Sequence, residues 1–285
     1  FDKTEIKFEL DKKKQPENIV FKTTKSSNKL IEEFMLLANK KVAEKMRKGK
    51  ERFVYRVHDQ PDQEKLKNLQ TVVKRMGYNL KLSPKELNDS LNSLLKNVLG
   101  KNEQNLIDTL MIRSMSKAEY TTKNIGHYGL SFDNYTHFTS PIRRYPDVMV
   151  HRLLQAEIEG EKIKTEETES LCKHSTHMEI LATKAERDSI KLMQIKFMKD
   201  KEGKTFDAVI SGVIARGIFV EVVENKCEGL VKAKDLPGDF FVHDQKNHRF
   251  VGEKTGKKYQ LGDKTRVMLI KADQIKKRLD FQVLT

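Results

Sequence analysis

The spacing of apolar residues along the chain changes near Asp200–Lys204. Before this point, apolar residues recur every three or four positions, a period that places them on one face of a helix. After Gly203 they occur in short β-branched runs, which glycines and polar turns separate, as is typical of strands. The pattern therefore predicts a mostly helical part over residues 1–200 and a small β domain over residues 203–285.

The helical part contains clear start and stop signals. Ser83-Pro84-Lys85-Glu86 has the sequence of a capping box with proline at the first helical position, and Gly77 and Gly100 follow predicted helices as C-terminal glycines commonly do. Phe53–Val57 alternates as a short strand does. Helices are predicted over residues 29–46, 61–76, 84–99, 105–115 and 165–199.

The β domain contains five predicted strands and one long connection. Five strands in about eighty residues fit a small closed barrel of the OB type. Pro237–Lys258 is expected to be a long, polar, basic loop, and loops of this kind commonly take part in binding. The expected fold class is therefore α+β. The strands are Phe206–Ile210, Gly217–Val223, Gly229–Val231, Thr265–Ile270 and Asp280–Val283.

Composition narrows the class of protein. The chain is 37% hydrophobic and 34% charged, which is typical of a soluble globular protein, and no run of about eighteen apolar residues could span a membrane. Cys172 and Cys227 stand far apart, which argues against disulfides and zinc and favours a reducing cytoplasm. His174 and His177 lack a second ligand pair, so a polar helix face is favoured over a metal site. The first residues do not have the pattern of a signal peptide. The start at Phe1, without a methionine, suggests that an upstream part is missing.

The net charge of +14 is spread along the chain. From Gly203 onward there are 16 basic and 11 acidic residues, so +5 lies in the β domain and +9 in the rest. A diffuse positive field attracts polyanions, largely through release of their counterions. The charge favours nucleic acid as a partner, although by itself it is weak evidence.

The stretch Gly126–Arg152 holds the most informative chemistry. Thr139-Ser140-Pro141 predicts the start of a helix or a turn, where free backbone N–H groups bind anions. Arg143 and Arg144 follow, and a guanidinium matches two phosphate oxygens at once. The alternative is that both arginines pair with Asp147 or other acids. Because successive helical residues point about 100° apart, we expect one arginine to face a site and the other to be structural.

The run from His127 to His151, with its core Tyr-Thr-His-Phe-Thr-Ser-Pro-Ile-Arg-Arg-Tyr-Pro-Asp, resembles the signature of the ribonuclease II/ribonuclease R (RNB) family. The motif is long and specific, and its double arginine, with the basic C-terminal half, is closer to the ribonuclease R branch. The C-terminal barrel resembles the family's S1-type RNA-binding domain. Further similar stretches are Lys29–Asn39, Phe53–His58, Ile112–Met115, Gly212–Val213, Arg216–Val220 and Glu228–Val231.

The resemblance implies a processive, hydrolytic 3′→5′ exoribonuclease that releases nucleoside 5′-monophosphates with Mg²⁺. The family holds its metal with aspartates spaced Asp-x5-Asp-x-Asp-Asp, and this spacing is absent, while Asp133, Asp147 and Asp188 are too far apart to replace it. The family's cold-shock domains are missing too. The chain thus resembles the second half of the catalytic domain plus the S1 domain. We expect no metal ligand in it, no activity from it alone, a monomer, and single-stranded RNA 3′ ends as partner.

Several residues match positions of the family's catalytic centre and RNA channel. Arg143 matches the arginine that contacts the scissile phosphate, where it would stabilise developing negative charge. Glu33, or Glu32 if the register slips by one, and Glu186 match acids near that site; the alternative for both is an exposed acid on a helix. Phe1 corresponds to an aromatic that stacks on bases in the channel.

The predicted RNA-binding residues also include Arg144 and four residues of the barrel. Phe219 matches a surface aromatic of S1-type domains, and stacking on a base contributes about 1–3 kcal/mol. Arg216 stands where the family often has an aromatic, and Lys232 where it has a histidine, which exchanges stacking for charge. Phe206 could stack on a base or fill the barrel, and the core is the more common place for a strand phenylalanine.

Two functions fit the sequence. The first is an exoribonuclease fragment that contributes Arg143 and a grip on RNA. The second is a non-catalytic module that binds single-stranded RNA through its barrel. The upstream sequence would discriminate between them, because intact aspartates support the enzyme, whereas Asn, Ser or Ala in their places support the binding module. A purely structural role has little support, since the phosphate-type motif would then have no use.

Overall fold

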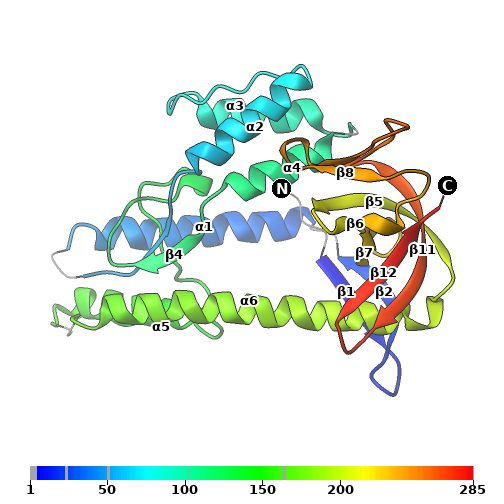
Figure 1. Ribbon diagram of the computed structural model, residues 1–285. Coiled ribbons are helices and arrows are strands. Elements are labelled where there is room, and N and C mark those ends of the chain that lie inside the picture. The colour runs from blue at the N-terminus through cyan, green and yellow to red at the C-terminus, as the bar shows by residue number, and fades with distance from the viewer. Residues whose placement is uncertain (1–4, 23–24, 50–51, 102, 163–164, 285) are drawn as a thin grey trace. The chain divides into compact units, whose positions relative to one another are not determined.

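The computed structural model describes residues 5–22, 25–49, 52–101, 103–162 and 165–284 (Figure 1). The chain forms two compact units. Unit 1 comprises Phe1–Thr23, Gln63–Ser114 and Arg187–Thr285, and unit 2 comprises Thr24–Asp62 and Met115–Glu186. Phe1 lies outside the described residues, so its predicted stacking role stays a prediction.

Three helices form the helical part of unit 1. They are α2 (Gln63–Arg75), α3 (Leu87–Val98) and α4 (Gln104–Ser114), and both α2 and α3 pack on α4. Each helix buries the apolar face that its period predicts. Gly77 and Gly100 take φ angles of +85° and +76°, the left-handed conformation that glycine accepts at a helix end. The buried residues are Leu66, Leu69, Val73, Leu87, Leu91, Leu94, Val98, Leu106, Ile107 and Met111.

Residues 83–86, which the sequence predicted as the start of α3, form a turn before the helix. The Ser83 hydroxyl donates to the Glu86 carboxylate at 2.7 Å, and the Leu87 N–H donates to the Ser83 carbonyl at 2.9 Å. The predicted capping box does not form, because Ser83 and Glu86 bond each other through their side chains and no side chain caps a backbone N–H of α3. Helix α3 begins at Leu87, later than its sequence signal suggests.

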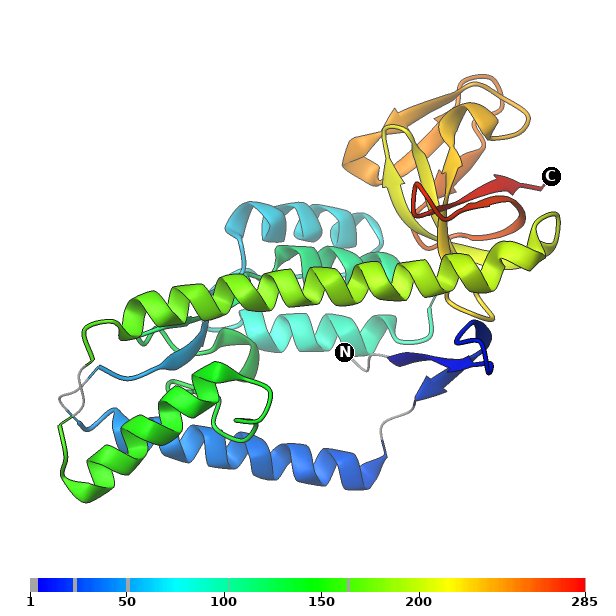
Figure 2. The same cartoon turned by 90° about the horizontal axis from the view of Figure 1, so that it is seen from below.

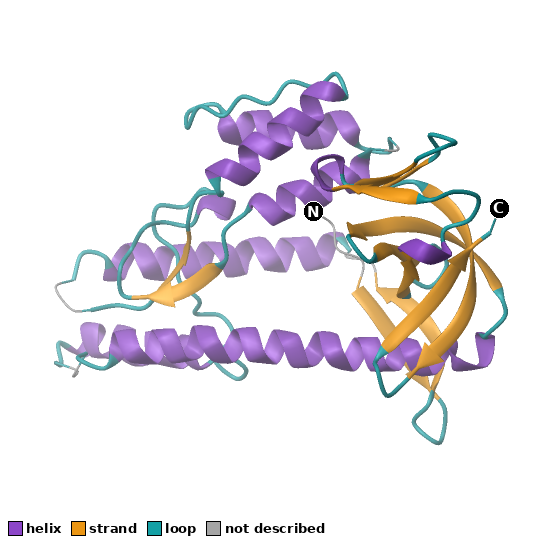
Figure 3. Ribbon diagram, in the orientation of Figure 1, coloured by secondary structure: helices purple, strands orange, loops and turns teal. Residues whose placement is uncertain are grey.

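The predicted five-stranded barrel is confirmed (Figure 3). Its strands are β5 (Thr205–Ile214), β6 (Gly217–Val222), β7 (Glu228–Lys232), β11 (Lys264–Asp273) and β12 (Arg278–Val283). They close in the order β11-β12-β7-β6-β5, with β12 and β7 parallel. Alternate residues fill the interior, as the two-residue period of a strand requires. Gly229 is needed where β12 passes β7, because a Cβ there would lie 2.5 Å from the Leu279 carbonyl oxygen.

The prediction of a loop over Pro237–Lys258 is wrong. This segment contains β8 (Phe241–Asp244), the 3-10 turn η4 (Gln245–Asn247) and β9 (Arg249–Gly252), and it leads into β10 (Lys258–Gln260). The strands form an antiparallel sheet in the order β10-β9-β8. Phe241, Phe250 and Tyr259 are buried in the same core as the barrel. These three rings attach the small sheet to the barrel, whereas Val242, next to Phe241, is 47% exposed.

Further short elements complete unit 1. An N-terminal hairpin, β1 (Glu5–Leu10) with β2 (Pro16–Lys22), was not predicted. Two 3-10 turns, η2 (Lys199–Lys201) and η3 (Ala233–Asp235), lie before β5 and after β7.

Unit 2 is built around a two-stranded antiparallel sheet of β3 (Tyr55–His58) and β4 (Ala118–Thr121). Its helices are α1 (Ser26–Met46) and α5 (Tyr145–Glu159), which contact each other, and a 3-10 turn, η1 (Tyr128–Leu130), follows β4. The core of this unit contains Ala43, Met46, Phe53, Val54, Tyr55, Val57, Tyr120, Met149, Val150, Leu153 and Cys172.

Helix α6 (Thr168–Met198) belongs to both units, because the division falls between Glu186 and Arg187 (Figure 2). Cys172, near its start, is buried in the core of unit 2. Ile195 and Met198, near its end, are fully buried in the core of the barrel. The end of α6 and the barrel therefore share one core on both sides of residue 200, where the sequence suggested a boundary.

Candidate functional site

The double arginine lies in a turn that a buried carboxylate fixes. The backbone N–H of Ser140 donates to Asp147 Oδ1 at 2.7 Å, and the N–H of Arg144 donates to the Ser140 carbonyl at 3.1 Å. Helix α5 begins only at Tyr145, so Thr139-Ser140-Pro141 starts a turn. The anion that the Ser140 N–H binds is therefore a side chain of the same segment.

The two arginines differ in what they contact. Arg144 pairs with Asp147 through Nε–Oδ2 and Nη2–Oδ1 distances of 2.9 Å each, and the Asp147 side chain is fully buried. Arg143 is exposed, and within the described ranges its guanidinium has no acidic partner. This geometry gives Arg144 an internal role and leaves Arg143 available to an external anion. The predicted RNA-binding role of Arg144 stays a prediction.

A second ion pair of unit 2 is connected to the signature segment through Tyr120. Arg56 on β3 donates to both carboxylate oxygens of Glu179 on α6, at 2.7 and 2.9 Å. The guanidinium also lies 4.6 Å from the centre of the Tyr120 ring on β4. The Tyr120 hydroxyl is 2.7 Å from Nδ1 of His137, a residue of the signature segment. These contacts join β3, β4, α6 and the signature segment.

Two buried histidines of this region, His127 and His137, have lowered pKa values. Burial, with a smaller effect of His58, lowers the pKa of His127 to about 4, and burial followed by the nearby Arg144 lowers the pKa of His137 to about 3. His58 accepts the Gly129 N–H at Nδ1 and lies 2.9 Å from the Ser116 carbonyl at Nε2, so its proton is on Nε2. Neither His127 nor His137 is suited to carry a proton in a reaction near neutral pH.

Asn39 joins α1 to the signature segment, a role the sequence gave no signal for. Its amide donates to the Tyr135 hydroxyl at 3.1 Å and accepts the Phe138 N–H at 3.0 Å, and it is 3% exposed. Residues seven apart share a helix face, so Glu32 lies on the same face as Asn39, whereas Glu33 points away from it. The choice between Glu33 and Glu32 stays a prediction.

The three predicted catalytic residues all belong to unit 2, but they are not in contact. Arg143, Glu33 and Glu186 are exposed, and no hydrogen bond or ion pair of the described residues joins any two of them. Their predicted roles stay predictions. For both glutamates the structure is that of an exposed acid on a helix.

The described residues do not fit a magnesium site. Across residues 5–22, 25–49, 52–101, 103–162 and 165–284, no three His, Cys, Asp or Glu side chains gather closely enough to hold a metal ion. Asp133 and Asp188 are exposed, and Asp147 is committed to Arg144 and Ser140. The aspartate cluster that the resemblance implies for the family therefore has no counterpart among the described side chains.

The barrel presents a flat aromatic surface on β6. The side chain of Phe219 points outward between the buried Ile218 and Val220 and lies over Gly212 of β5, where a Cβ would be 3.3 Å from the ring. Leu230 of β7 is its neighbour on the other side. A partly exposed ring supported by neighbouring strands can stack on a base.

Two cations lie at one end of this surface. Lys232 is the register partner of Gly217, and the Ala233 N–H donates to the Arg216 carbonyl at 2.9 Å. The structure therefore brings together Phe219 of β6, Lys232 of β7 and Arg216, which lies in the turn just before β6. Phe206, by contrast, is 8% exposed and belongs to the barrel core, the alternative that the sequence favoured.

Comparison with known proteins gives the class. Residues 1–160 match the RNB domain, and residues 199–284 match the S1 RNA binding domain. The chain therefore belongs to the RNB family, as its signature segment predicted. Residues between the two matches are covered by neither, so the domain boundary predicted near residue 200 stays a prediction.

The similar proteins include several ribonucleases R. The chain is 38% identical to ribonuclease R of Aquifex aeolicus (strain VF5), over 100% of this chain and 41% of that protein. It is 33% identical to ribonuclease R of Escherichia coli (strain K12), over 100% of this chain and 37% of that protein. The chain thus spans well under half the length of these relatives.

Solved structures agree. Mycoplasma genitalium RNase R, in complex with ribose methylated single-stranded RNA, has a TM-score of 0.92 at 28% identity and covers 99% of this chain and 45% of its own. Yeast Ssd1, a pseudonuclease, has a TM-score of 0.61 at 26% identity over 78% of this chain and 28% of its own. In the part of the chain that the structure describes, no helix is long and apolar enough to cross a membrane.

Proposed function

We propose that this chain is part of a hydrolytic 3′→5′ exoribonuclease that releases nucleoside 5′-monophosphates processively from single-stranded RNA 3′ ends. The chain supplies a phosphate-contacting arginine and a surface that holds the RNA strand. The observation that carries the proposal is the contrast between Arg144, paired with the buried Asp147, and the adjacent Arg143, which is exposed on a fixed turn.

Arg143 binds the phosphate at which the RNA strand is hydrolysed. A guanidinium can donate two parallel hydrogen bonds to phosphate oxygens, and it stays charged at any physiological pH. Because the turn is already fixed by Ser140 and Asp147, little reorganisation is needed when negative charge develops in the transition state. Glu33, or Glu32, and Glu186 would act from the same unit.

We propose that magnesium is held mainly by residues outside this chain, a view supported by the lack of a cluster of three His, Cys, Asp or Glu side chains among the described residues. When bound, such an ion would activate water and neutralise charge on the phosphate. The role of the present chain is to bind and orient the RNA.

The barrel holds the strand. Phe219 stacks on a base, while Arg216 and Lys232 contact phosphates and make the affinity depend on salt. RNA as the ligand is supported by the match to the S1 RNA binding domain and by solved structures of Mycoplasma genitalium RNase R, in complex with single-stranded and with double-stranded RNA.

A non-catalytic RNA-binding protein is the second candidate. The similarity to a pseudonuclease and the lack of a carboxylate cluster in the described residues favour it. The two candidates differ in the remaining sequence of the protein. An Asp-x5-Asp-x-Asp-Asp run there supports the enzyme, and its replacement by Asn, Ser or Ala supports the binding protein.

The test is hydrolysis of a 5′-labelled single-stranded RNA by the full-length protein, with Mg²⁺ or with EDTA. The enzyme produces successively shorter labelled products and nucleoside 5′-monophosphates, and EDTA abolishes both. The 285-residue chain alone produces neither. Binding without hydrolysis by the full-length protein would favour the second candidate. We also propose a cytoplasmic monomer, which light scattering and cell fractionation test.

A further inference from the structure

A groove in unit 1 shares no lining residue with the arginine turn or with the Phe219 surface. It has a volume of about 770 Å³, within the range of small-molecule sites. Three segments far apart in the sequence form its walls: α2, α4 and the η4 turn of the barrel's inserted sheet. The lining residues are Lys65, Asn68, Leu69, Thr71, Val72, Arg75, Leu110, Arg113, Gln245 and His248.

The groove is lined by both apolar and cationic residues. Its apolar lining residues are Leu69, Val72 and Leu110, of which Leu69 is only 1% exposed. Three of the ten lining residues are Lys or Arg, and none is Asp or Glu. A ligand that fits must therefore have a flat or apolar part and at least one negative group.

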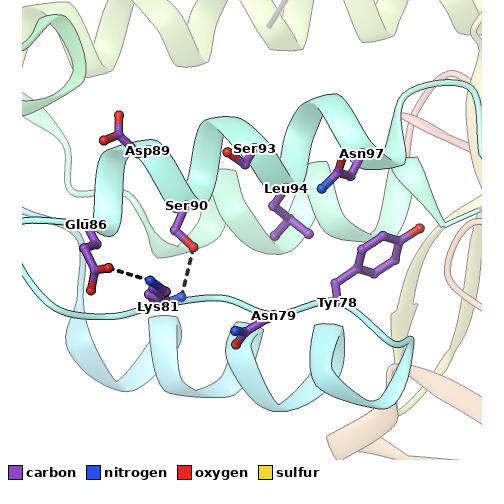
Figure 4. A pocket seen from close by; sticks show the side chains of 9 residues that line it. All are labelled: Tyr78, Asn79, Lys81, Glu86, Asp89, Ser90, Ser93, Leu94 and Asn97. Atoms are coloured by element: carbon purple, nitrogen blue, oxygen red, sulfur yellow. Dashed lines mark hydrogen bonds and ion pairs between the residues drawn. The ribbon is translucent and has the colours of Figure 1, made fainter.

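A second pocket of the same unit shows that this charge pattern is specific. It lies between α3 and Tyr78–Lys81 and has a volume of about 310 Å³ (Figure 4). Its lysine, Lys81, pairs with Glu86 at 2.5 Å, and its Lys81 N–H donates to Ser90 at 2.9 Å. Asp89 also lines it. Cation and acid compensate each other there, so it has no preference for an anion.

The barrel side of the groove is rigid. Asp244 accepts the Asn247 N–H at 3.2 Å, the Asn247 amide at 2.6 Å and Arg249 Nε at 2.9 Å. Arg75 of α2 in turn donates to the Asn247 side chain, which links the helical wall to η4. These polar contacts fix the η4 turn and connect it to α2.

His248 adds a neutral polar group to the site. Its backbone is left-handed, with φ of +49°, and burial, followed by the charges of Arg113 and His243, lowers its pKa, while Asp244 opposes this. A neutral imidazole offers one donor and one acceptor nitrogen, which can bind the edge of a base.

We propose that this groove is a second RNA-binding site, which takes one nucleoside monophosphate unit, with the base against Val72 and Leu110 and the phosphate at Arg113. The inference rests on the proposed function and extends it by naming a further contact with RNA. The same chemistry is present in a free nucleoside 5′-monophosphate, which is the product of that function.

Photo-cross-linking of the whole chain tests the site. The probes are 4-thiouridine 5′-monophosphate and an oligouridine with one 4-thiouridine, each followed by peptide mapping with mass spectrometry. Cross-links are expected in peptides containing residues 63–75, 104–114 or 245–248. Arg113→Ala should weaken binding at these peptides about tenfold, the loss expected for one charge-assisted hydrogen bond. Arg113→Lys should restore part of it.

The matched control is Lys96→Ala, which removes one exposed cation from α3, outside the groove. It should leave the groove cross-links unchanged. Labelling by the mononucleotide assigns the site to free nucleotide, whereas labelling only by the oligomer assigns it to an RNA strand. No cross-link at these peptides, or equal losses in Arg113→Ala and Lys96→Ala, would overturn the proposal. Cross-links at the Phe219 peptide in the same samples report on the proposed function separately.

Discussion

Arg143 and Arg144 are adjacent in the chain but lie in opposite environments. The guanidinium of Arg144 is engaged by the fully buried Asp147, whereas that of Arg143 is exposed on the same turn. The ion pair keeps Arg144 directed inward and fixes the backbone next to it. Substitutions at the two positions should therefore have different kinds of effect.

Arg143→Lys in the full-length enzyme should lower turnover by about 10²–10³-fold, the usual loss for one preorganised donor, with little change in RNA affinity. Lysine keeps the charge but loses the planar fork that matches two phosphate oxygens. Single-turnover kinetics and a separate RNA titration measure the two quantities. Arg152→Lys, an exposed position on α5, is the control. Weaker binding with unchanged turnover would make Arg143 a docking residue only.

Asp147→Ala should destabilise the chain by about 3–5 kcal/mol, because it leaves a partly buried guanidinium without its partner. Asp147→Asn should cost less, since an amide oxygen still accepts the Ser140 N–H. Urea unfolding measures both variants, and Asp133→Ala, at an exposed position, is the control. Equal stability of the wild type and Asp147→Ala would show that the ion pair does not hold the turn.

Phe219→Ala should weaken single-stranded RNA binding by about 1–3 kcal/mol, the contribution of stacking on one base. Arg216→Ala should instead reduce the salt dependence of binding by about one phosphate contact. Anisotropy titrations at several salt concentrations measure both effects. Phe240→Ala, which removes a ring that is 70% exposed, is the matched control. If the two phenylalanine variants lose the same affinity, the stacking surface is not centred on Phe219.

Unit 2 should lose stability as the pH falls below about 6.5. The folded-state pKa values of His127 and His137, about 4 and about 3, lie below the ordinary value of 6.5. In that interval the unfolded chain therefore takes up protons that the folded chain does not, at a cost of up to about tenfold in the folding equilibrium per pH unit and histidine. Stability is fully present above pH 6.5.

Hydrogen exchange in peptides that cover β4 and the signature segment, between pH 7 and pH 5, measures this loss after correction for intrinsic exchange rates. The window ends above the range in which Glu169 takes up its proton, since the pKa of that carboxylate is lowered by its hydrogen bonds to Thr122 and Thr121, against the opposing effect of burial. His137→Gln should flatten the pH dependence, and His174→Gln, at an exposed position, should not. A slope that His137→Gln leaves unchanged would assign the effect to other groups.

The sequence predicted the elements whose side chains repeat with a clear period. The helices from Leu66 to Met111 and the five barrel strands are examples, because burial of one face leaves a regular trace. The sheet within Pro237–Lys258 was missed because its strands are short and each contributes only one or two inward residues. Strand β4 was missed for the same reason.

The chemistry of the candidate site was predictable only where a motif carried it. The double arginine was found from its local sequence, and Asp147 was named as its possible partner. Asn39 was not found, because its contacts with Tyr135 and Phe138 connect positions about a hundred residues apart. The groove at Arg113 was equally hidden, since its walls come from three separate segments.

The C-terminal turns of α6 lie outside the sequence match to the S1 domain but inside the folded core of the barrel. Ile195 and Met198 precede the S1 match, which begins at residue 199, yet both are fully buried in the barrel core. A fragment cut at residue 199 or 203 would lose both side chains, and the loss of one buried side chain of this size commonly costs about 2–5 kcal/mol. The unit that recurs among sequences is therefore smaller than the unit that can be expected to fold, and an expressible barrel should begin no later than Arg187.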